Sequence, residues 1–507
     1  MTDKVLIVGA GPTGLVLALW LTKQGVGVRI IDKSAGPGET ARAMAVQART
    51  LELYRQLDLG DAAVAAGHRD LAMNLWAGGK RRAELPLDKA GAGLTPYPFL
   101  LVFPQDQHER FLIDRLATLG VSVERRTELL SFEEKEGCVA ARLRTPDGSE
   151  EQCEASYLAG CDGASSLVRK QVGGRFEGGT YKQVFYVADV ALSGLRPANE
   201  GHIALDGSDF VMVLPYGDTG LFRLIGTVIG ERAERPETLA FEDVSHEAID
   251  RLGIKVDKVN WFSHYRVHHR VTDSFRHGRA FLLGDAAHVH SPAGGQGMNT
   301  GIGDAINLAW KLAAVVKGGA PDGLLDSYDA ERRAFARKVV DTTDRLFTFA
   351  TAQGGFADFV RAHIFPTVAS AAYGLDSVRE FVFRTVSQTS LTYRDSPLSA
   401  GEAGKVRGGD RLPWVSTPGA DNYEPLREIG WQTHVYGAAH PDLRAWCARH
   451  GVALHVFAWS PACETAGFAR DAAYLLRPDT YVAVADAQQS VAALDGYVLA
   501  RGFALRG

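Results

Sequence analysis

The N-terminal segment carries a strand, a glycine-rich turn, a helix and a second strand, and this order limits the possible folds more than any other feature. An apolar strand is predicted at residues 5–8, and the second strand ends at Asp32. The turn between the first strand and the helix contains Gly9, Gly11 and Gly14. Glycines at this spacing let a turn and a helix start approach a pyrophosphate, and an acid about 20 residues further on accepts hydrogen bonds from ribose hydroxyls. The pattern predicts a Rossmann-like dinucleotide-binding unit in an α/β fold. It leaves open whether the adenosine belongs to a flavin or to a nicotinamide.

A second strand, turn and helix follow at residues 278–308. The short apolar run 280–283 ends at Gly284 and Asp285, where open α/β sheets place their ligands. A glycine-rich run, 294–297, then precedes a helix whose N-terminus offers unpaired N–H donors and a partial positive charge. We expect Asp285 to be a ligand-binding residue and the helix start to suit an anionic or electron-rich ring edge. An ordinary corner, in which the glycines only turn the chain, is the alternative.

Bulk composition excludes several classes of protein. A chain of 507 residues is too long for one core and indicates several domains. The net charge of -5 gives no reason to expect nucleic acid, and no apolar run approaches the roughly 18 residues of a membrane span. The five cysteines form no CxxC pair, so neither a zinc site nor a disulfide framework is indicated and a reducing cytoplasm is expected. We therefore expect a cytoplasmic protein with a small-molecule partner, and neither nucleic acid nor a membrane.

Further polar residues lie at element ends between residues 42 and 169. Arg42 precedes a predicted helix at 47–57 and either clamps a phosphate or is a solvated surface charge. Gln105 lies near the start of another helix. Alternating residues at 121–158 predict a small antiparallel ribbon. A second strand-end acid follows the ribbon at Asp162, with Arg169 downstream.

Residues 175–276 change to β-like runs, which predicts a sheet inserted between two halves of the nucleotide-binding domain. Four of its residues would suit a flat aromatic ligand, although they fit a plain core equally well: Phe210, Met212, Tyr216 and Phe222. A long helix is predicted at 328–346, and its charged run 329–333 is interpreted as a solvated face.

The C-terminal part reads as a linker and a small α/β domain. Glycine and proline rise between 401 and 418, which we interpret as a linker. Strand-like runs follow at 454–459 and 481–484, and a final helix begins at about residue 487.

Three motifs occur in order along the chain: the turn at Gly9, Gly11 and Gly14; Cys161-Asp162-Gly163 with Ser166 and Arg169; and Gly284-Asp285 with Pro292, Gly297, Met298 and Asn299. Together they resemble the single-component FAD-dependent aromatic hydroxylases, the para-hydroxybenzoate hydroxylase class. The tail, with Arg477-Pro478-Asp479, is similar to the thioredoxin-like domain of the phenol and polyketide hydroxylase branch, but without a CxxC it is assigned no redox chemistry.

The resemblance implies an FAD-binding domain at 1–174 and 277–400, an inserted substrate-binding sheet at 175–276, and a thioredoxin-like domain at 401–507. It implies these cofactor-binding residues: Gly9, Gly11, Gly14, Asp32, Arg42, Gln105, Asp162, Arg169, Asp285, Gly297, Met298 and Asn299.

Roles within this set follow from the same resemblance. Gly11 and Gly14 would approach the pyrophosphate and Asp32 the adenosine ribose. Arg42 and Gln105 would contact the diphosphate and ribityl region, and Asp285 would bind the ribityl chain. Asp162 and Arg169 would shape the approach of the nicotinamide.

The catalytic residues would be Pro292, Gly297 and Met298. Pro292 would lie beside the reactive edge of the flavin, and backbone N–H groups of Gly297, Met298 and Asn299 would stabilise negative charge on reduced flavin. His288 and His290 are either general acid-base groups or structural hydrogen-bonding residues, and we favour the structural role.

The implied reaction is a monooxygenation. NAD(P)H, expected to be NADPH, reduces FAD; O₂ then adds to the flavin as a C4a-hydroperoxide, which hydroxylates a phenolic or polyketide-type aromatic substrate. A monomer or homodimer is expected, and the size of the substrate is left open. Two alternatives are a flavin-dependent halogenase, whose WxWxIP segment is absent, and a non-redox nucleotide-binding carrier.

Overall fold

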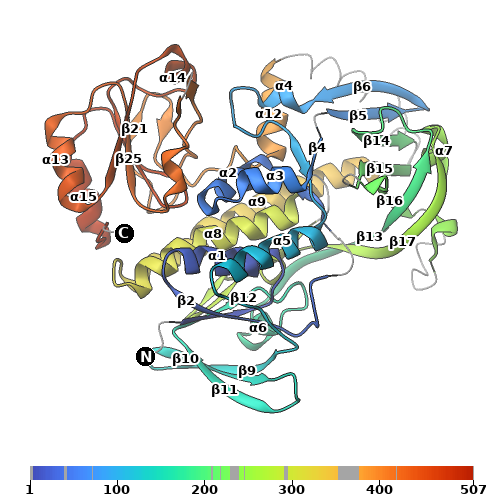
Figure 1. Ribbon diagram of the computed structural model, residues 1–507, viewed down its shortest axis with the longest axis horizontal. Helices are drawn as coiled ribbons and strands as arrows, with labels where there is room; N and C mark the ends of the chain where they lie inside the picture. Colours follow the sequence, from blue (N-terminus) through green and yellow to red (C-terminus); the bar gives the residue numbers. More distant parts are fainter. Residues whose placement is uncertain are drawn as a thin grey trace.

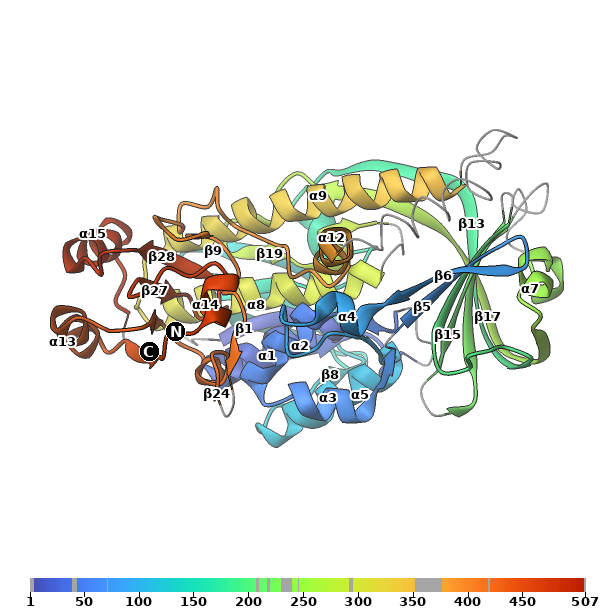
Figure 2. The same cartoon turned by 90° about the horizontal axis from the view of Figure 1, so that it is seen from above.

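The computed structural model describes residues 4–38, 43–70, 72–206, 209–216, 219–228, 239–244, 246–290, 295–351, 376–417 and 420–505. Two of the predicted site residues, Arg42 and Pro292, lie outside these ranges. Figure 2 shows three parts along the long axis: a C-terminal domain at one end, a central α/β domain, and a large sheet at the other end. Within the described residues, the helices are all too short or too polar to cross a bilayer.

A six-stranded sheet forms the centre of the α/β domain. In order across the sheet its strands are β18 (Arg276–His277), β19 (Ala280–Leu282), β12 (Tyr157–Gly160), β1 (Lys4–Val8), β2 (Gly27–Asp32) and β8 (Glu124–Arg125). β1 pairs in parallel with β2 and β12, and β12 pairs in parallel with β19. Because parallel strands end at the same edge of a sheet, the three sequence motifs that follow β1, β12 and β19 come together.

Helices cover one face of this sheet and a smaller sheet covers the other (Figure 1). The helices are α1 (Pro12–Lys23), α5 (Gln105–Thr118) and α8 (Gln296–Val316), with α2 (Ala48–Tyr54) and α3 (Gly60–Ala66) around them. The short helix α6 (Leu167–Gln171) contacts β12, β19 and β9. The smaller sheet, β9 (Glu128–Lys135), β10 (Cys138–Arg144) and β11 (Glu150–Ala155), is the predicted ribbon. Apolar residues of α1 and α8, such as Leu15 and Ile306, are buried against the central strands, which fixes both helices.

The large sheet has eight strands. In order they are β20 (His288–Val289), β17 (Lys255–Thr272), β13 (Phe176–Ser193), β16 (Phe222–Val228), β15 (Asp209–Pro215), β14 (Gly201–Asp206), β5 (Ala72–Ala77) and β6 (Lys80–Pro86). Five of them lie within the predicted range 175–276, whereas β5, β6 and β20 come from segments predicted to belong to the nucleotide-binding domain. Local sequence patterns do not reveal such long-range pairing.

The remaining elements connect these parts. A small sheet of β3 (Ala45–Val46), β7 (Leu100–Val102) and β4 (His68–Asp70) lies beside helices α4 (Leu87–Gly91) and α12 (Asp376–Val386), while α7 (Glu247–Arg251) covers the outer face of the large sheet. The long helix α9 (Asp326–Thr351) runs from the central domain toward the large sheet (Figure 2). The interpretation of its charged run as a solvated face is wrong, because Glu331 and Arg332 are 4% and 1% exposed. Burial of these charges is tolerated because Arg332 pairs with Asp304 and Glu331 pairs with Arg477.

The C-terminal domain is a four-stranded sheet with helices. Its strands, in sheet order, are β26 (Ala453–Phe457), β25 (Gln432–Tyr436), β27 (Ala473–Leu476) and β28 (Val482–Asp486), and its helices are α13 (Pro441–His450), α14 (Pro461–Thr465) and α15 (Val491–Arg501). β25 is parallel to β26 and antiparallel to β27, in the predicted thioredoxin-like arrangement.

The predicted linker is wrong for its described part, through Thr417. This segment forms β21 (Glu402–Ala403), β22 (Val406–Arg407) and β23 (Ser416–Thr417), and Leu412 is buried in the core of the domain. The glycines permit close packing rather than flexibility: a Cβ at Gly401 would lie 2.3 Å from the carbonyl oxygen of Ala485.

Candidate functional site

The glycine turn between β1 and α1 has two glycines that the fold requires and one that leaves space. Gly9 has a φ of 105°, and a Cβ there would lie 2.3 Å from the carbonyl oxygen of Cys161. A Cβ at Gly14 would lie 2.0 Å from the carbonyl oxygen of Gly9. A Cβ at Gly11 would meet nothing within 4 Å. Gly9 and Gly14 therefore serve close packing, whereas Gly11 faces open space at the start of α1, where a ligand phosphate can approach.

Asp32, at the end of β2, is bonded to the same turn. One carboxylate oxygen accepts a hydrogen bond of 2.7 Å from the backbone N–H of Ala10, and the other accepts one of 2.7 Å from the N–H of Ser34. The carboxylate thus lies beside the glycine turn, and its bonds to a ribose stay a prediction.

Asp162 and Arg169 use their side chains inside the fold. Asp162 accepts hydrogen bonds from the Ser166 hydroxyl at 2.6 Å and from the N–H of Leu167 at 2.7 Å, and so caps α6. Arg169 donates to the carbonyl oxygen of Ala286 at 2.7 Å. The Asp162 motif therefore packs against the glycine turn and bonds the Asp285 turn. The side chains of Asp162 and Arg169 form hydrogen bonds within the protein.

Asp285 is exposed, although Gly284 and Ala286 on either side of it are buried. Its turn packs directly against α1: Gly284 has a φ of 57°, and a Cβ there would lie 2.7 Å from the Oγ1 atom of Thr13. The turn that carries the exposed Asp285 therefore packs against the first turn of α1.

The start of α8 completes this edge. Gly295, at the N-cap, has a φ of 62° and no side chain to cap the helix. An α-helix leaves its first N–H groups without intrahelical partners, and Gly297, Met298 and Asn299 lie in this first turn. A Cβ at Gly301, one turn later, would lie 3.1 Å from the Cα of Gly284, so α8 and the Asp285 turn are in close contact.

The side chain of Asn299 locks the first turn of α8 to the start of α2. Its Oδ1 atom accepts hydrogen bonds from the N–H of Gln47 at 2.9 Å and the hydroxyl of Thr50 at 2.8 Å. Its Nδ2 atom donates to the carbonyl oxygens of Ala45 and Gly295, each at 2.8 Å. The sequence predicted a role for the backbone N–H of Asn299 only. The structure shows that its side-chain carboxamide also holds the start of α8 in place.

Sequence reasoning missed Asp304, which is fully buried on α8. Its Oδ2 atom accepts hydrogen bonds from the N–H of Gly284 at 3.0 Å and from Nε2 of His288 at 2.7 Å, and its Oδ1 atom accepts one of 2.6 Å from Arg332. Burial opposes ionisation, but the neighbouring Arg332 and His288 hold the pKa of Asp304 below its ordinary value. His288, at 1% exposure, therefore has the structural role that we favoured.

Gln105 begins α5 and faces the segment before β3. Its side chain accepts a hydrogen bond of 3.2 Å from the N–H of Ala43 and donates one of 2.8 Å to Glu109, which in turn accepts from the N–H of Gly38 at 3.0 Å. Gln105 thus lies next to Ala43, at the edge of the described residues.

The four predicted wall residues do not share one face of the large sheet. Phe210 and Met212 alternate with Val211 on β15, and Met212 packs with Met44 and Val102 on the side of the central domain. Tyr216 packs in the same cluster. Phe222 packs instead in the outer cluster beneath α7, so the expectation that it belongs to the same wall is corrected. Successive strand residues point to opposite faces, and the sequence alone did not give this register.

The inner face also carries a buried ion pair that the sequence did not reveal. Arg223 donates two hydrogen bonds to Asp189, at 2.7 and 2.8 Å, and its guanidinium lies 5.1 Å from the ring centroid of Tyr216. Arg223 stands between Phe222 and Leu224 in an apolar strand, so only the paired register shows that it faces Asp189.

The edge of the central sheet fits the FAD that the motifs imply. Gly11 leaves open space at the start of α1, Asp285 is exposed on a turn that packs against α1, and the N-terminus of α8 supplies N–H donors. An acceptor for ribityl hydroxyls and donors for an electron-rich ring are therefore placed on adjoining elements. Among the residues that the structure describes, no cluster of His, Cys, Asp or Glu is suited to hold a metal ion.

Comparison with known proteins identifies the family of the chain. A family model described as FAD binding domain matches residues 2–343. The 6-methylpretetramide 4-monooxygenase of Streptomyces rimosus is 38% identical over 448 residues, which are 87% of this chain and 76% of the relative. Pentachlorophenol 4-monooxygenase of Sphingobium chlorophenolicum is 32% identical over 423 residues, 81% of this chain and 75% of the relative.

A solved structure extends the likeness to the whole chain. OxyS anhydrotetracycline hydroxylase from Streptomyces rimosus matches with a TM-score of 0.78 and 27% identity, over 100% of both chains. The fold and site define an FAD-binding oxidoreductase, and the chain belongs to the FAD binding domain family of aromatic monooxygenases. It is a flavin-dependent aromatic hydroxylase, and neither the halogenase nor the carrier alternative is retained.

Proposed function

We propose that this flavin-dependent hydroxylase acts on a fused-ring phenol of the polyketide type and takes its electrons from NADPH. Two similar proteins are named for pretetramide and anhydrotetracycline substrates, which supports a fused-ring substrate. The inner face of the large sheet, with Phe210, Met212 and Tyr216, offers the apolar and aromatic surface that a flat ring system requires.

The single observation that carries the proposal is the meeting of Gly11, Asp285 and the first turn of α8 at one edge of the central sheet. In this proposal Gly11 leaves room for the FAD pyrophosphate at the start of α1, while Gly14 lets α1 pack against the turn at Gly9. Asp32 accepts hydrogen bonds from the adenosine ribose. Arg42 and Gln105 hold the diphosphate and ribityl region, and Asp285 binds the ribityl hydroxyls.

Other residues act at the reacting end. When bound, FAD supplies hydride acceptance and the activation of O₂. The N–H groups of Gly297, Met298 and Asn299 stabilise negative charge at the pyrimidine side of the ring, and Pro292 lies beside its reactive edge. Asp162 and Arg169 act indirectly, by holding the turns that carry Gly9 and Asp285.

Tyr216 is suited to orient a substrate as a hydrogen-bond donor. Burial raises the pKa of Tyr216 to about 12, so its hydroxyl stays protonated at neutral pH. The hydroxyl already donates to Asp106 across 3.3 Å, a long bond that a substrate oxygen is able to replace.

The test uses the purified holoenzyme with NADPH or NADH and three groups of compounds: fused-ring phenols, single-ring phenols, and matched fused rings without a hydroxyl. Pyridine nucleotide oxidation, peroxide release and ¹⁸O incorporation from ¹⁸O₂ are measured together. We expect fused-ring phenols both to accelerate NADPH oxidation and to gain one ¹⁸O atom. Oxygen transfer only to single-ring phenols would overturn the assigned substrate size, and peroxide release without ¹⁸O transfer to any compound would overturn the proposed substrate class.

A further inference from the structure

The turn Arg477–Thr480 of the C-terminal domain is buried, although hairpin turns ordinarily lie at the surface. It connects β27 to β28 and is closed by a 2.9 Å hydrogen bond from the N–H of Thr480 to the carbonyl oxygen of Arg477. Arg477, Asp479 and Thr480 are only 1–3% exposed. A polar turn becomes buried only when its groups find partners elsewhere, and here the partners belong to the cofactor-binding domain.

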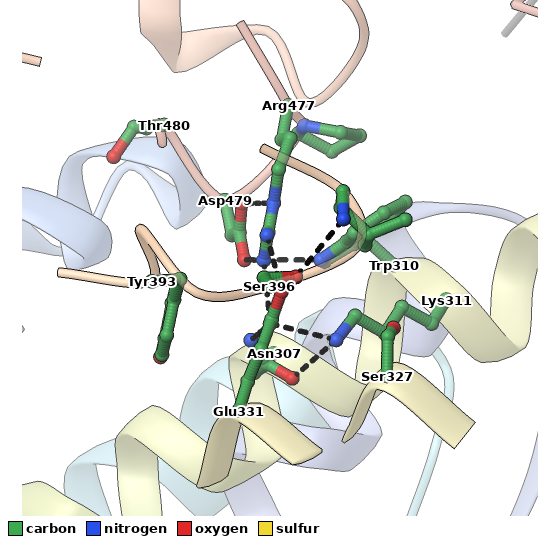
Figure 3. A network of polar contacts seen from close by, with 12 residues as sticks. Asn307, Trp310, Lys311, Ser327, Glu331, Tyr393, Ser396, Arg477, Asp479 and Thr480 are labelled. Atoms are coloured by element: carbon green, nitrogen blue, oxygen red, sulfur yellow. Dashed lines mark hydrogen bonds and ion pairs between the residues drawn. The ribbon is translucent and has the colours of Figure 1, made fainter. Parts of the chain in front are cut away.

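One set of partners lies on α8 and α9 (Figure 3). Arg477 donates to the carboxylate of Glu331 on α9 at 2.6 and 3.0 Å, and also to Asp479. Asp479 accepts a hydrogen bond of 3.0 Å from the indole N–H of Trp310 on α8. Lys311, also on α8, donates to Glu331 at 2.8 Å. The turn therefore ties the middle of α8 to α9.

A second set of partners lies on α2 and the short helix that follows it. Arg49 donates to the carbonyl oxygen of Asp479 at 3.0 Å and to the hydroxyl of Thr480 at 2.7 Å. Gln56 donates to the carbonyl oxygen of Pro478 at 2.8 Å. Next to Arg49, Thr50 bonds the side chain of Asn299 in the first turn of α8. The contacts thus lead from the turn through α2 to the helix start at the cofactor site.

We propose that the Arg477–Thr480 turn is a positioning element for the cofactor site, and that Arg49 is the positioning residue through which it acts. The turn holds α2 in the place where Gln47 and Thr50 bond Asn299, and it holds α8 at Trp310. With both helices fixed, the N–H groups at the start of α8 keep one orientation toward the ring. The inference rests on the proposed placement of the flavin at the start of α8.

The chain offers a matched control for this proposal. Arg55, the residue directly after α2, also joins the two domains, with ion pairs of 2.7 Å to Asp421 and 2.8 Å to Glu424. The contacts of its side chain lead to the C-terminal domain and not to Asn299. Substituting Arg49 or Arg55 removes an interdomain arginine in each case. Only the change at Arg49 removes the contacts between the turn and the part of α2 that bonds Asn299.

The experiment compares Arg49→Met, Arg49→Lys and Arg55→Met with the unaltered full-length protein. In Arg49→Met, Glu52 keeps its ion pair with Arg411, so no buried carboxylate is left alone. Dissociation of FAD is followed by flavin fluorescence, the environment of the ring by its visible absorption and midpoint potential, and domain docking by thermal unfolding of the apoprotein.

We expect Arg49→Met to weaken FAD binding about tenfold, the effect of losing hydrogen bonds from a charged donor, and to alter the flavin absorption spectrum and midpoint potential. Arg49→Lys restores the charge but not the forked geometry and should be intermediate. Arg55→Met should lower the apoprotein unfolding temperature yet keep the FAD dissociation constant within about twofold, well below the tenfold step of one strong interaction.

Equal FAD affinity, spectrum and midpoint potential in the Arg49→Met and Arg55→Met proteins would overturn the positioning role and leave the turn as a docking contact only. Failure of the unaltered protein to bind FAD would instead overturn the placement of the cofactor, so the two failures are distinguishable.

Discussion

The backbone N–H of Gly284 donates a hydrogen bond of 3.0 Å to the carboxylate of Asp304, twenty residues later in the chain. This bond joins the turn that presents Asp285 to the helix whose first turn faces the same edge. Because Arg332 and His288 bond the same carboxylate, Asp304 fixes the relative position of three separate segments. The geometry of the cofactor site therefore depends on a residue that is itself fully buried.

Replacement of Asp304 should be strongly destabilising. Asp304→Ala leaves the buried guanidinium of Arg332 without its charged partner, which costs about 3–5 kcal/mol. We expect a lower denaturant midpoint and apoprotein on purification, measured by urea unfolding and flavin content. As a control, Asp326→Asn alters a carboxylate whose side chain is 76% exposed and should change stability by less than about 1 kcal/mol. Equal effects of the two changes would refute the role given to Asp304.

Asp285 should affect cofactor binding with little effect on the fold. Its carboxylate is exposed, so Asp285→Ala should give mostly apoprotein whose thermal unfolding matches that of unaltered apoprotein. Flavin content after purification and FAD titration measure the result. The exposed Asp257 of β17 serves as control, since Asp257→Ala should retain FAD. Full FAD retention by Asp285→Ala would contradict the assigned contact.

Two glycines of the same turn should respond differently to the same methyl group. Gly14→Ala places a Cβ 2.0 Å from the carbonyl oxygen of Gly9, so we expect the apoprotein to lose about 1–3 kcal/mol of stability. Gly11→Ala meets no atom within 4 Å and should cost less than about 1 kcal/mol, but its methyl group occupies the space offered to the pyrophosphate. FAD affinity and apoprotein unfolding separate the effects. A Gly11→Ala protein with unchanged FAD affinity would rule out this approach.

Neighbouring residues of β15 test which face of the large sheet meets the substrate. Met212 lies on the inner face, and Met212→Ala should raise the KM for the aromatic substrate about tenfold. Val211 lies on the outer face in the core beneath α7 and is 1% exposed, so Val211→Ala should cost about 1–3 kcal/mol of stability with KM unchanged. Steady-state kinetics and urea unfolding are the measurements. The reverse pattern would show that the outer face binds the substrate.

Lys311 should make stability depend on pH in the alkaline range. Burial, reinforced by the charge of Arg477, lowers the pKa of Lys311 from 10.5 to about 8 in spite of Glu331. Between pH 8 and 10.5 the unfolded chain binds more protons at Lys311 than the folded chain does. The contribution of Lys311 to the free energy of unfolding therefore rises by about 1.4 kcal/mol per pH unit in this window. It is least favourable below pH 8, where the side chain is protonated in both states.

Urea unfolding of the unaltered protein and of Lys311→Met at pH 7.5, 8.5 and 9.5 tests this dependence. The difference in unfolding free energy between the two proteins should change in favour of the unaltered protein as the pH rises. Parallel curves for the two proteins would contradict the lowered pKa.

Local patterns in the sequence were enough to predict much of the central domain. The glycine turn, the strand that ends at Asp32 and the strand before Asp285 are each specified by residues a few positions apart in the chain. Such local patterns can be recognised in the sequence without knowledge of the fold. Parallel pairing of β1, β12 and β19 then brings the three motifs to one edge. The family and the α/β class were therefore predictable from the chain alone.

Tertiary structure decided which polar side chains serve the fold. Glu331 and Arg332 look like a charged helix surface, but packing against α8 and the C-terminal domain buries both. Phe222 and Met212 look equivalent until strand register places them on opposite faces. The sequence determined the elements and the cofactor pattern because these depend on neighbours along the chain. The burial of a side chain, its ion pairs and the face of the sheet to which it points depend on residues far apart in sequence. Only the folded chain therefore fixes them.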